Sequence, residues 1–225
     1  FLLASLTISN TYAVDPANAP ERSSGKFSKA LVHGNRSMVV TNNPLASKVA
    51  DDVLLQGGTA TDAAIAAGFV LGLTEPQSSG IGGGGYAISL DDGKLSAYDG
   101  REVAPHSATP DMFVKSDGQL MTFDAARFSA QAIGVPSEVA LFRKMHQDSG
   151  KLSWAQLVQP AIQLAEQGFP MGPRLHTQLM ASVNTLGKIQ SLADVYFDRE
   201  GRVKPIGTLV KNLDYAKTLK VIAAN

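Results

Sequence analysis

A dense run of glycines restricts what residues 75–86 can form. Five of the six positions from 80 to 85 are glycine, and Ile81 is the exception. Glycine has no Cβ, so it lets a second stretch of backbone approach closely, at a cost in conformational entropy. The run therefore predicts a place where the backbone, rather than the side chains, forms a packing or binding surface.

The segments on either side of this run argue against a phosphate-binding loop. A dinucleotide-binding loop has a strand before its glycines and a helix after them. Here residues 61–71 are Ala-rich and predict a helix before the glycines. After them, residues 86–90 and 94–99 are short apolar runs separated by Asp92-Gly93, which is typical of a β-hairpin. This order of helix, glycine-rich loop and hairpin does not suit a nucleotide.

Composition excludes several partners and chemistries. The chain has 225 residues with 20 basic and 20 acidic side chains, so it has no basic surplus to attract nucleic acid or an anionic membrane. It has no cysteine, which excludes disulfides, thiol catalysis and cysteine-ligated zinc. The four histidines lack the spacing of metal ligands, and no metal site is predicted from them: His33, His106, His146 and His176.

The N-terminal residues suggest an exported precursor. Residues 1–8 resemble the apolar core of a secretory signal, and residues 11–13 offer small side chains at a cleavage site. An ordinary apolar segment is the alternative, and the stretch is too short to span a membrane. We expect a partial signal peptide at 1–13, a flexible leader at 14–36 and the folded portion at 37–225. The expected location is the periplasm or the extracellular space.

Several helices are predicted from caps and periodicity. Asn43 is a good N-cap followed by Pro44, and apolar residues then recur every fourth position. The helix expected over 60–73 is apolar on almost every side and should be buried. Residues 100–135 form an irregular, loop-rich pattern. Further on, Pro160 is expected to kink a helix or to start a new one.

Arg101 is the strongest candidate for binding chemistry. It follows the predicted hairpin, and a guanidinium held at a strand end can grip a carboxylate with two parallel hydrogen bonds. Glu102 beside it would fix its orientation, although an ordinary surface Arg–Glu pair gives the same pattern. No nucleophile stands out, because Ser78 and Ser79 lie near the glycines but lack a Gly-x-Ser-x-Gly elbow.

Taken in order, the motifs of residues 37–225 resemble those of the γ-glutamyltranspeptidases. The most specific is Glu-Pro-x-x-Ser-Gly-Ile-Gly-Gly-Gly-Gly at residues 75–85. The other matching segments are 38–47, 57–64, 101–105, 134–136, 150–154, 160–162 and 168–170. Chance agreement of this many motifs in the order of the family is negligible. The resemblance places the chain in the N-terminal part of the large subunit.

The resemblance implies an α+β fold of the N-terminal nucleophile hydrolase type, an αββα sandwich of which this chain is an incomplete, helix-rich part. A precursor of this family cuts itself into a large and a small subunit. The new N-terminal Thr of the small subunit attacks the γ-glutamyl amide of glutathione. The γ-glutamyl group then passes to water, an amino acid or a peptide, while backbone amides hold the oxyanion. No cofactor, metal or nucleic acid is implied, and the implied partner is the small subunit.

Only a few roles carry over to this chain. Arg101 matches the arginine that binds the α-carboxylate of the γ-glutamyl group, and Glu102 is the neighbour that orients it. Gly100 departs from the residue types usual before this arginine, which predicts a looser pocket wall. The nucleophilic Thr is expected downstream of Asn225, so this piece alone is predicted to be inactive. A structural role, close backbone packing under the site, is expected for the glycines of the run: Gly80, Gly82, Gly83, Gly84 and Gly85.

Two alternatives stay open. A relative of the same fold, such as a cephalosporin (glutaryl) acylase or a poly-γ-glutamate capsule depolymerase, would share these motifs. Arg101 favours a γ-glutamyl donor, but downstream residues decide between these substrates. A large-subunit piece without a nucleophile would instead be a non-catalytic binding or interaction module, whose bare core face predicts aggregation.

Overall fold

The structure is a computed structural model that describes residues 30–225. Contacts divide the chain into two units, Phe1–Val32 and His33–Asn225, and the fold described here is that of the second unit. The predicted signal peptide (1–13) and most of the predicted leader (14–36) lie outside the described residues. Within the described part, no helix combines the length and the apolar composition that a membrane crossing needs.

The first two helices begin at side-chain caps. Helix α1 (Pro44–Leu55) has its proline in the first turn, and the Asn43 side chain accepts a backbone N–H of that turn. Helix α2 (Ala60–Thr74) begins with a capping box, in which the side chains of Thr59 and Asp62 each accept the other's backbone N–H. Both helices form where the sequence predicts them, and α2 is buried along most of its length.

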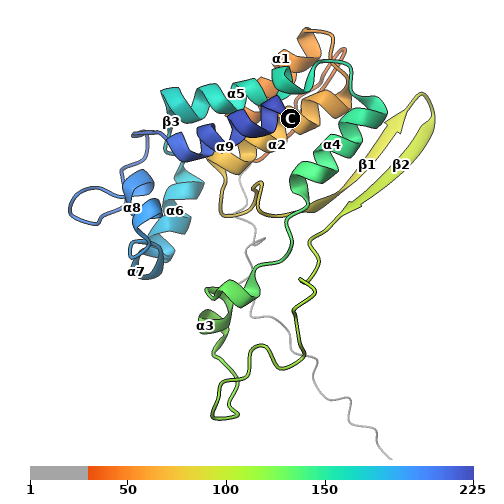
Figure 1. Cartoon of the computed structure of the whole chain (residues 1–225). Helices are drawn as coiled ribbons and strands as arrows, with labels where there is room; N and C mark the ends of the chain where they lie inside the picture. Colours follow the sequence, from red (N-terminus) through yellow and green to blue (C-terminus); the bar gives the residue numbers. More distant parts are fainter. Residues whose placement is uncertain (1–29) are drawn as a thin grey trace, which may run out of the picture. The chain divides into compact units, whose positions relative to one another are not determined.

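Helix α2 lies at the centre of a cluster that we call the helical core (Figure 1). The other members of the helical core are α1, α4 (Glu138–Ser149), α5 (Trp154–Gln167) and α9 (Leu213–Ala224). Phe69 of α2 is fully buried, and its ring meets those of Phe142 and Trp154 edge to face, with centroids 5.2 and 5.6 Å away. Such aromatic pairs stabilise a fold by about 0.5–1.5 kcal/mol each beyond their buried area.

Helix α5 runs as a single helix through Pro160, so no second helix starts there. The apolar side chains on both flanks of the proline are at most 2% exposed: Leu157, Val158, Ala161 and Ile162. They belong to the face that packs against α2 and α9. This burial offsets the backbone hydrogen bond that proline cannot donate inside a helix.

Strands β1 (Gly85–Asp91) and β2 (Lys94–Gly100) form the predicted antiparallel hairpin. Its turn has φ of 46° at Asp92 and 79° at Gly93, the left-handed conformation that suits a two-residue hairpin turn. One face of the hairpin packs against α4, with Ala87 and Tyr98 partly buried there.

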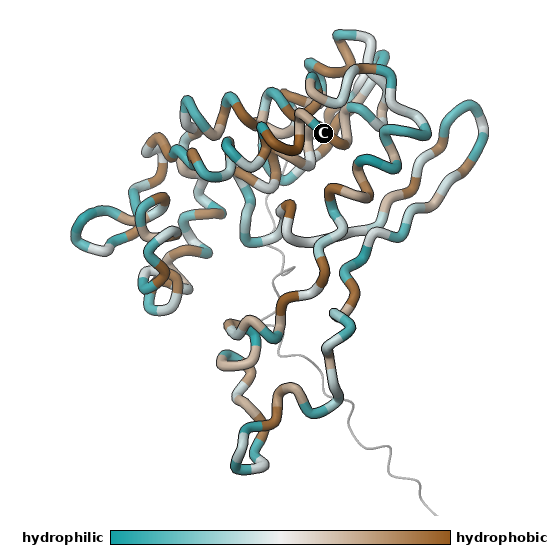
Figure 2. The backbone as a smooth tube through the Cα atoms, viewed as in Figure 1, coloured by the Kyte–Doolittle hydropathy of each residue, from teal (hydrophilic) through white to brown (hydrophobic). Residues whose placement is uncertain are grey.

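The opposite face of the hairpin is apolar and exposed. We call it the outer face, and it consists of Tyr86, Ile88, Leu90 and Leu95. Each of these side chains is at least 70% exposed, and hydrophobic and hydrophilic colours alternate along the hairpin in Figure 2. Because successive side chains of a strand point to opposite faces, the hairpin has one face on α4 and a second apolar face without a cover in the described chain.

The remaining segments contain short elements. Between β2 and α4, the irregular stretch 101–135 holds α3 (Phe123–Arg127) and the 3-10 turn η2 (Ala130–Ala132). A second two-stranded antiparallel sheet, made of β3 and β4, frames three helices. These elements are β3 (Phe169–Pro170), α6 (Pro173–Ala181), α7 (Val183–Leu186), α8 (Gln190–Tyr196) and β4 (Leu209–Val210).

Candidate functional site

Arg101 follows directly on β2, where the hairpin passes into the irregular stretch 101–135 (Figure 1). Its backbone N–H donates to Asp99 Oδ1 at 3.1 Å. Its side chain is 59% exposed, and Nη1 lies 3.3 Å from Glu102 Oε2. Much of the guanidinium therefore stays accessible to a ligand carboxylate, as a bidentate contact requires.

Glu102 is half-buried beside Arg101, with 27% of its side chain exposed. Its Oε2 is buried and makes no hydrogen bond within the described residues, although the Arg101 guanidinium lies within ion-pair distance. A buried carboxylate oxygen of this kind depends on a nearby cation for its stability. The two side chains form an ion pair without a hydrogen bond at Oε2, and the orienting role of Glu102 stays a prediction.

The first turn of α4 closes over the glycine run. Gly83 O accepts hydrogen bonds from the backbone N–H groups of both Ser137 and Glu138, each at 2.9 Å. Ser137 Oγ also donates to Gly100 O at 2.5 Å. We call this meeting of residues 83–84, 100 and 137–138 the glycine junction. It joins the end of the glycine run, the end of β2 and the start of α4 next to Arg101.

The glycines of the run differ in how closely they are packed. A Cβ at Gly84 would lie 2.2 Å from Gly100 O and 2.6 Å from Ser137 Oγ, closer than real atoms approach. A Cβ at the other four would meet nothing nearer than 3.3 Å: Gly80, Gly82, Gly83 and Gly85. At Gly80 and Gly82 nothing lies within 4 Å. The steric requirement for glycine is therefore strongest at Gly84, and the two open positions have none.

Glu138 brings a second carboxylate to the glycine junction. Burial and the negative charge of Glu102 raise the pKa of Glu138 above its ordinary value. The site thus combines the cationic Arg101 with two carboxyl groups. A ligand that carries both an anionic and a cationic group, such as the head group of an amino acid, matches this mixture of charges.

A buried ion pair holds the segment that precedes the glycines. Arg174 Nη1 donates to Glu75 Oε2 at 2.6 Å, and Arg174 Nη2 donates to Ser78 Oγ at 3.0 Å. Asn43 Nδ2 donates to Glu75 Oε1 at 2.9 Å. Only 5% of the Glu75 side chain is exposed, so these hydrogen bonds offset the cost of burying its charge. Sequence reasoning missed Arg174, because it lies 99 positions from Glu75 and nothing in its neighbourhood marks it.

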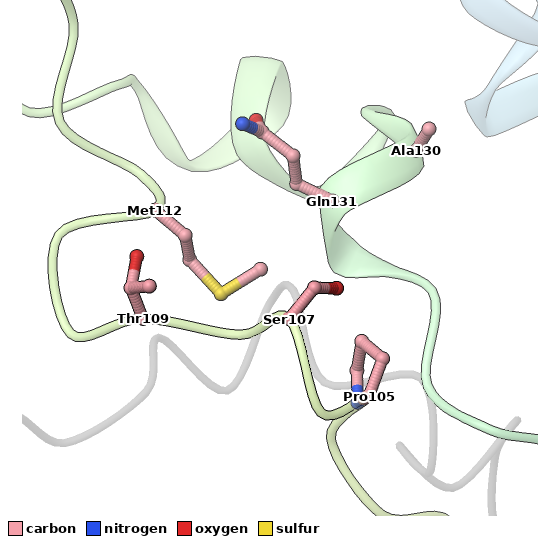
Figure 3. Close-up of a pocket in the computed structure, with 6 residues that line it drawn as sticks. All are labelled: Pro105, Ser107, Thr109, Met112, Ala130 and Gln131. Atoms are coloured by element: carbon pink, nitrogen blue, oxygen red, sulfur yellow. The ribbon is translucent and has the colours of Figure 1, made fainter.

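A separate hollow of about 430 Å³ lies within the stretch 101–135 (Figure 3). It is lined by Pro105, Ser107, Thr109, Met112, Ala130 and Gln131. None of these six side chains is charged, so the hollow has no cation for a ligand carboxylate. The candidate binding site is therefore the surface around Arg101 rather than this hollow.

The described residues show no metal site and no activated serine. No group of three His, Asp or Glu residues within 30–225 is placed to hold a metal ion. Ser78 Oγ accepts a hydrogen bond from Arg174, and among the described residues its hydroxyl donates to no histidine. His146 Nε2 lies 2.8 Å from Leu152 O, in the loop between α4 and α5, and not from a serine. This chain therefore offers a candidate binding group, Arg101, and no candidate bond-breaking group among its described residues.

The fold and the site together define a class of protein. The structure matches the crystal structure of Helicobacter pylori gamma-glutamyltranspeptidase with a TM-score of 0.81 and 33% sequence identity, over 87% of this chain and 56% of that chain. The described chain accordingly has the fold of a part of an N-terminal nucleophile hydrolase, with mixed helix and sheet.

Sequence comparisons give the family within this class. The profile described as Gamma-glutamyltranspeptidase matches residues 46–225. The chain is 38% identical to the glutathione hydrolase proenzyme of Bacillus subtilis (strain 168), over 92% of this chain and 35% of that protein. It is 35% identical to the acylase ACY 1 proenzyme of Pseudomonas sp. (strain SE83), over 93% of this chain and 38% of that protein. The chain belongs to the γ-glutamyltranspeptidase family, and it spans little more than a third of the length of these relatives.

Proposed function

We propose that this chain is part of the large subunit of an exported γ-glutamyltranspeptidase, a glutathione hydrolase. The whole enzyme would cleave the γ-glutamyl amide of glutathione and related compounds. It would pass the γ-glutamyl group to water, amino acids or peptides. The observation that carries this proposal is the accessible guanidinium of Arg101, held at the end of β2 beside the half-buried Glu102.

In this proposal the chain binds the donor and does not break the bond. Arg101 holds the α-carboxylate of the γ-glutamyl group with charge-assisted hydrogen bonds, and Glu102 orients the guanidinium. A threonine at the N-terminus of the small subunit attacks the γ-carbonyl, and its free amine takes the hydroxyl proton. The amide C–N bond breaks, the amine leaves with a proton, and water or an acceptor amine then attacks the γ-glutamyl ester. The described chain alone would therefore be inactive.

The proposed partner is the small subunit from the same precursor. The outer face of the hairpin supports this proposal, because exposed apolar patches of this kind mark interaction surfaces. Export to the periplasm or the extracellular space is proposed from the apolar N-terminal sequence. Cell fractionation of the tagged precursor tests the location, and a product that stays in the cytoplasm would contradict it.

Substitution of Arg101 in the whole precursor tests the proposed function. Arg101→Ala should raise KM for a γ-glutamyl anilide by about 30- to 1000-fold, because a bidentate charge-assisted contact contributes about 2–4 kcal/mol. Arg101→Lys should recover only part of this loss, since an ammonium cannot form the parallel pair of hydrogen bonds.

Arg127→Ala is a matched control for this experiment. Arg127 also lies in the stretch 101–135 and has an acidic neighbour, Asp124, with 3.7 Å between Nε and Oδ1. Its removal should leave KM for the anilide unchanged. Equal kinetics for the Arg101→Ala variant and the unchanged enzyme would contradict the assignment of Arg101 as the donor-binding group.

An acylase is the second candidate function. The similarity to the acylase ACY 1 proenzyme, 35% identity over 93% of this chain, is nearly as strong as the similarity to the glutathione hydrolases. Glutaryl side chains lack the α-amino group of a γ-glutamyl donor, so a competition assay between glutathione and a glutaryl amide separates the two. Preferential cleavage of the glutaryl amide would replace the first proposal with this one.

A further inference from the structure

Ser137 stands at the N-cap position of α4, where a serine side chain normally accepts a backbone N–H of the first turn. Its hydroxyl makes no such cap. It donates instead to Gly100 O at 2.5 Å, across 37 positions of sequence. The Ser137 side chain thus makes a long-range contact in place of the local cap. This contact lies next to Arg101, which carries the candidate binding group.

Residues 101–102 lie between two fixed backbone points. Before them, Gly100 O accepts from Ser137 Oγ. After them, Val103 O accepts from the Val135 N–H at 2.9 Å in an isolated antiparallel bridge. Both donors belong to the short segment that leads into α4. The backbone from which the Arg101 side chain extends is therefore held on both sides by one segment.

Packing at the glycine junction leaves little room for the backbone to shift. Gly100 is buried, and a Cβ placed on it would lie 2.7 Å from Leu141 Cβ. Gly84 faces the Ser137 hydroxyl so closely that a Cβ there would lie 2.6 Å from Oγ. Loss of this hydroxyl would open a gap and remove one hydrogen bond from the Gly100 carbonyl, a change that favours local rearrangement. The first residue to be displaced would be Arg101, which follows Gly100 directly.

We propose that Ser137 is a positioning residue for Arg101, whose hydroxyl fixes the Gly100 carbonyl and so aims the guanidinium at the donor carboxylate. This inference rests on the proposed function, because it concerns the same binding site. Ser137 acts through the backbone and does not touch the donor. Its removal should therefore weaken donor binding without changing the chemical step.

The test is made in the whole processed enzyme with a γ-glutamyl anilide as donor. Ser137→Ala should raise KM by about three- to tenfold, the effect of one lost intramolecular hydrogen bond, and should leave kcat within about twofold. Ser137→Thr keeps the hydroxyl and should restore most of the affinity. Ser129→Ala is the matched control, because the Ser129 hydroxyl donates to Ala126 O at 2.6 Å in the same stretch of chain without contacting the glycine junction.

A double-mutant cycle with Arg101→Ala separates positioning from a general structural role. If Ser137 acts through Arg101, adding Ser137→Ala to the Arg101→Ala enzyme should change KM by less than about twofold. Independent, multiplicative effects of the two substitutions, or an equal loss of kcat, would overturn the inference. So would an unchanged KM in Ser137→Ala.

Failure of this inference can be told from failure of the proposed function. A raised KM in Arg101→Ala together with normal kinetics in Ser137→Ala rejects Ser137 alone. Normal donor kinetics in Arg101→Ala would reject the assignment of Arg101, and the role of Ser137 would then fall with it.

Discussion

The helical core and the β1–β2 hairpin differ in how much of their apolar surface is buried within the described chain. Phe69, Ile65 and Leu157 of the helical core are fully buried. Tyr86 and Ile88 of the hairpin are 70% and 78% exposed. The helical core is thus stabilised by contacts within this chain. The hairpin is attached at its α4 face and at the glycine junction. Its outer face stays exposed in the described chain and is available to a partner subunit.

This difference follows from how the hairpin is attached to the rest of the fold. The part of the site with candidate chemistry, around Arg101, lies at the end of the hairpin that is held by the glycine junction. The outer face extends from there along both strands. A rigid attachment at one end and an apolar surface along the rest suit an element that positions a binding group and also receives a partner.

The largest predicted effect on stability tests the buried helical core. Phe69→Ala in the purified chain should lower the free energy of unfolding by about 3–5 kcal/mol, because it leaves a cavity between the rings of Phe142 and Trp154. Urea denaturation followed by Trp fluorescence measures the change.

Ile88→Ala is the corresponding substitution on the exposed outer face of the hairpin. In the purified chain this substitution should change the free energy of unfolding by less than about 0.5 kcal/mol, as expected for an exposed position. In the whole precursor, a covered outer face should raise the cost of the same substitution to about 2 kcal/mol or more. Equal small effects in both settings would show that the outer face stays uncovered.

The next prediction concerns the attachment of the hairpin. Gly84→Ala should lower the free energy of unfolding by about 1–3 kcal/mol, because its Cβ would collide with the backbone carbonyl of Gly100. Gly82→Ala is the matched control and should be nearly neutral, since nothing lies within 4 Å of its Cβ. Thermal unfolding of both variants gives the comparison. Similar losses of stability at the two positions would contradict a junction centred on Gly84.

The sequence predicts those parts of the fold that depend on neighbouring residues. The cap at Asn43 and the Asp92-Gly93 turn are local signals, and the structure confirms the elements that they predict. The adjacency of Arg101 and Glu102 is likewise readable from the chain. The course of α5 is only partly readable, because the sequence allows Pro160 to kink a helix or to start a new one. The structure excludes the new helix, and distant helices bury both flanks of the proline.

The glycine junction shows why the rest of the candidate site could not be predicted. Nothing in the sequence around Ser137 marks a long-range contact, and only the folded chain reveals that its hydroxyl donates to Gly100 O. The sequence likewise gives no sign of the contact between Arg174 and Glu75. Side chains that act across tens of positions leave no periodicity or spacing behind, so the supports of the site appear only in three dimensions.

The smallest predicted effect tests the electrostatics of the glycine junction through Glu138. Burial and the charge of Glu102 raise the pKa of Glu138 in the folded chain. Between the ordinary pKa of glutamate, about 4.3, and the raised value, the folded state binds more protons than the unfolded state. The free energy of unfolding therefore falls as pH rises through this window.

Glu138→Gln removes this dependence, because an amide does not titrate. The variant should match the unchanged chain at pH 4 and be more stable than it at pH 7, as measured by urea denaturation at both values. Glu166→Gln is the control, since the exposed Glu166 pairs with Lys220 and its replacement should bring no gain at pH 7. If Glu138→Gln and the unchanged chain differ by the same amount at both pH values, then neither burial nor the charge of Glu102 raises the pKa of Glu138 in the fold. The glycine junction would then support Arg101 through hydrogen bonds alone, and the contrast with the helical core would be one of geometry rather than of charge.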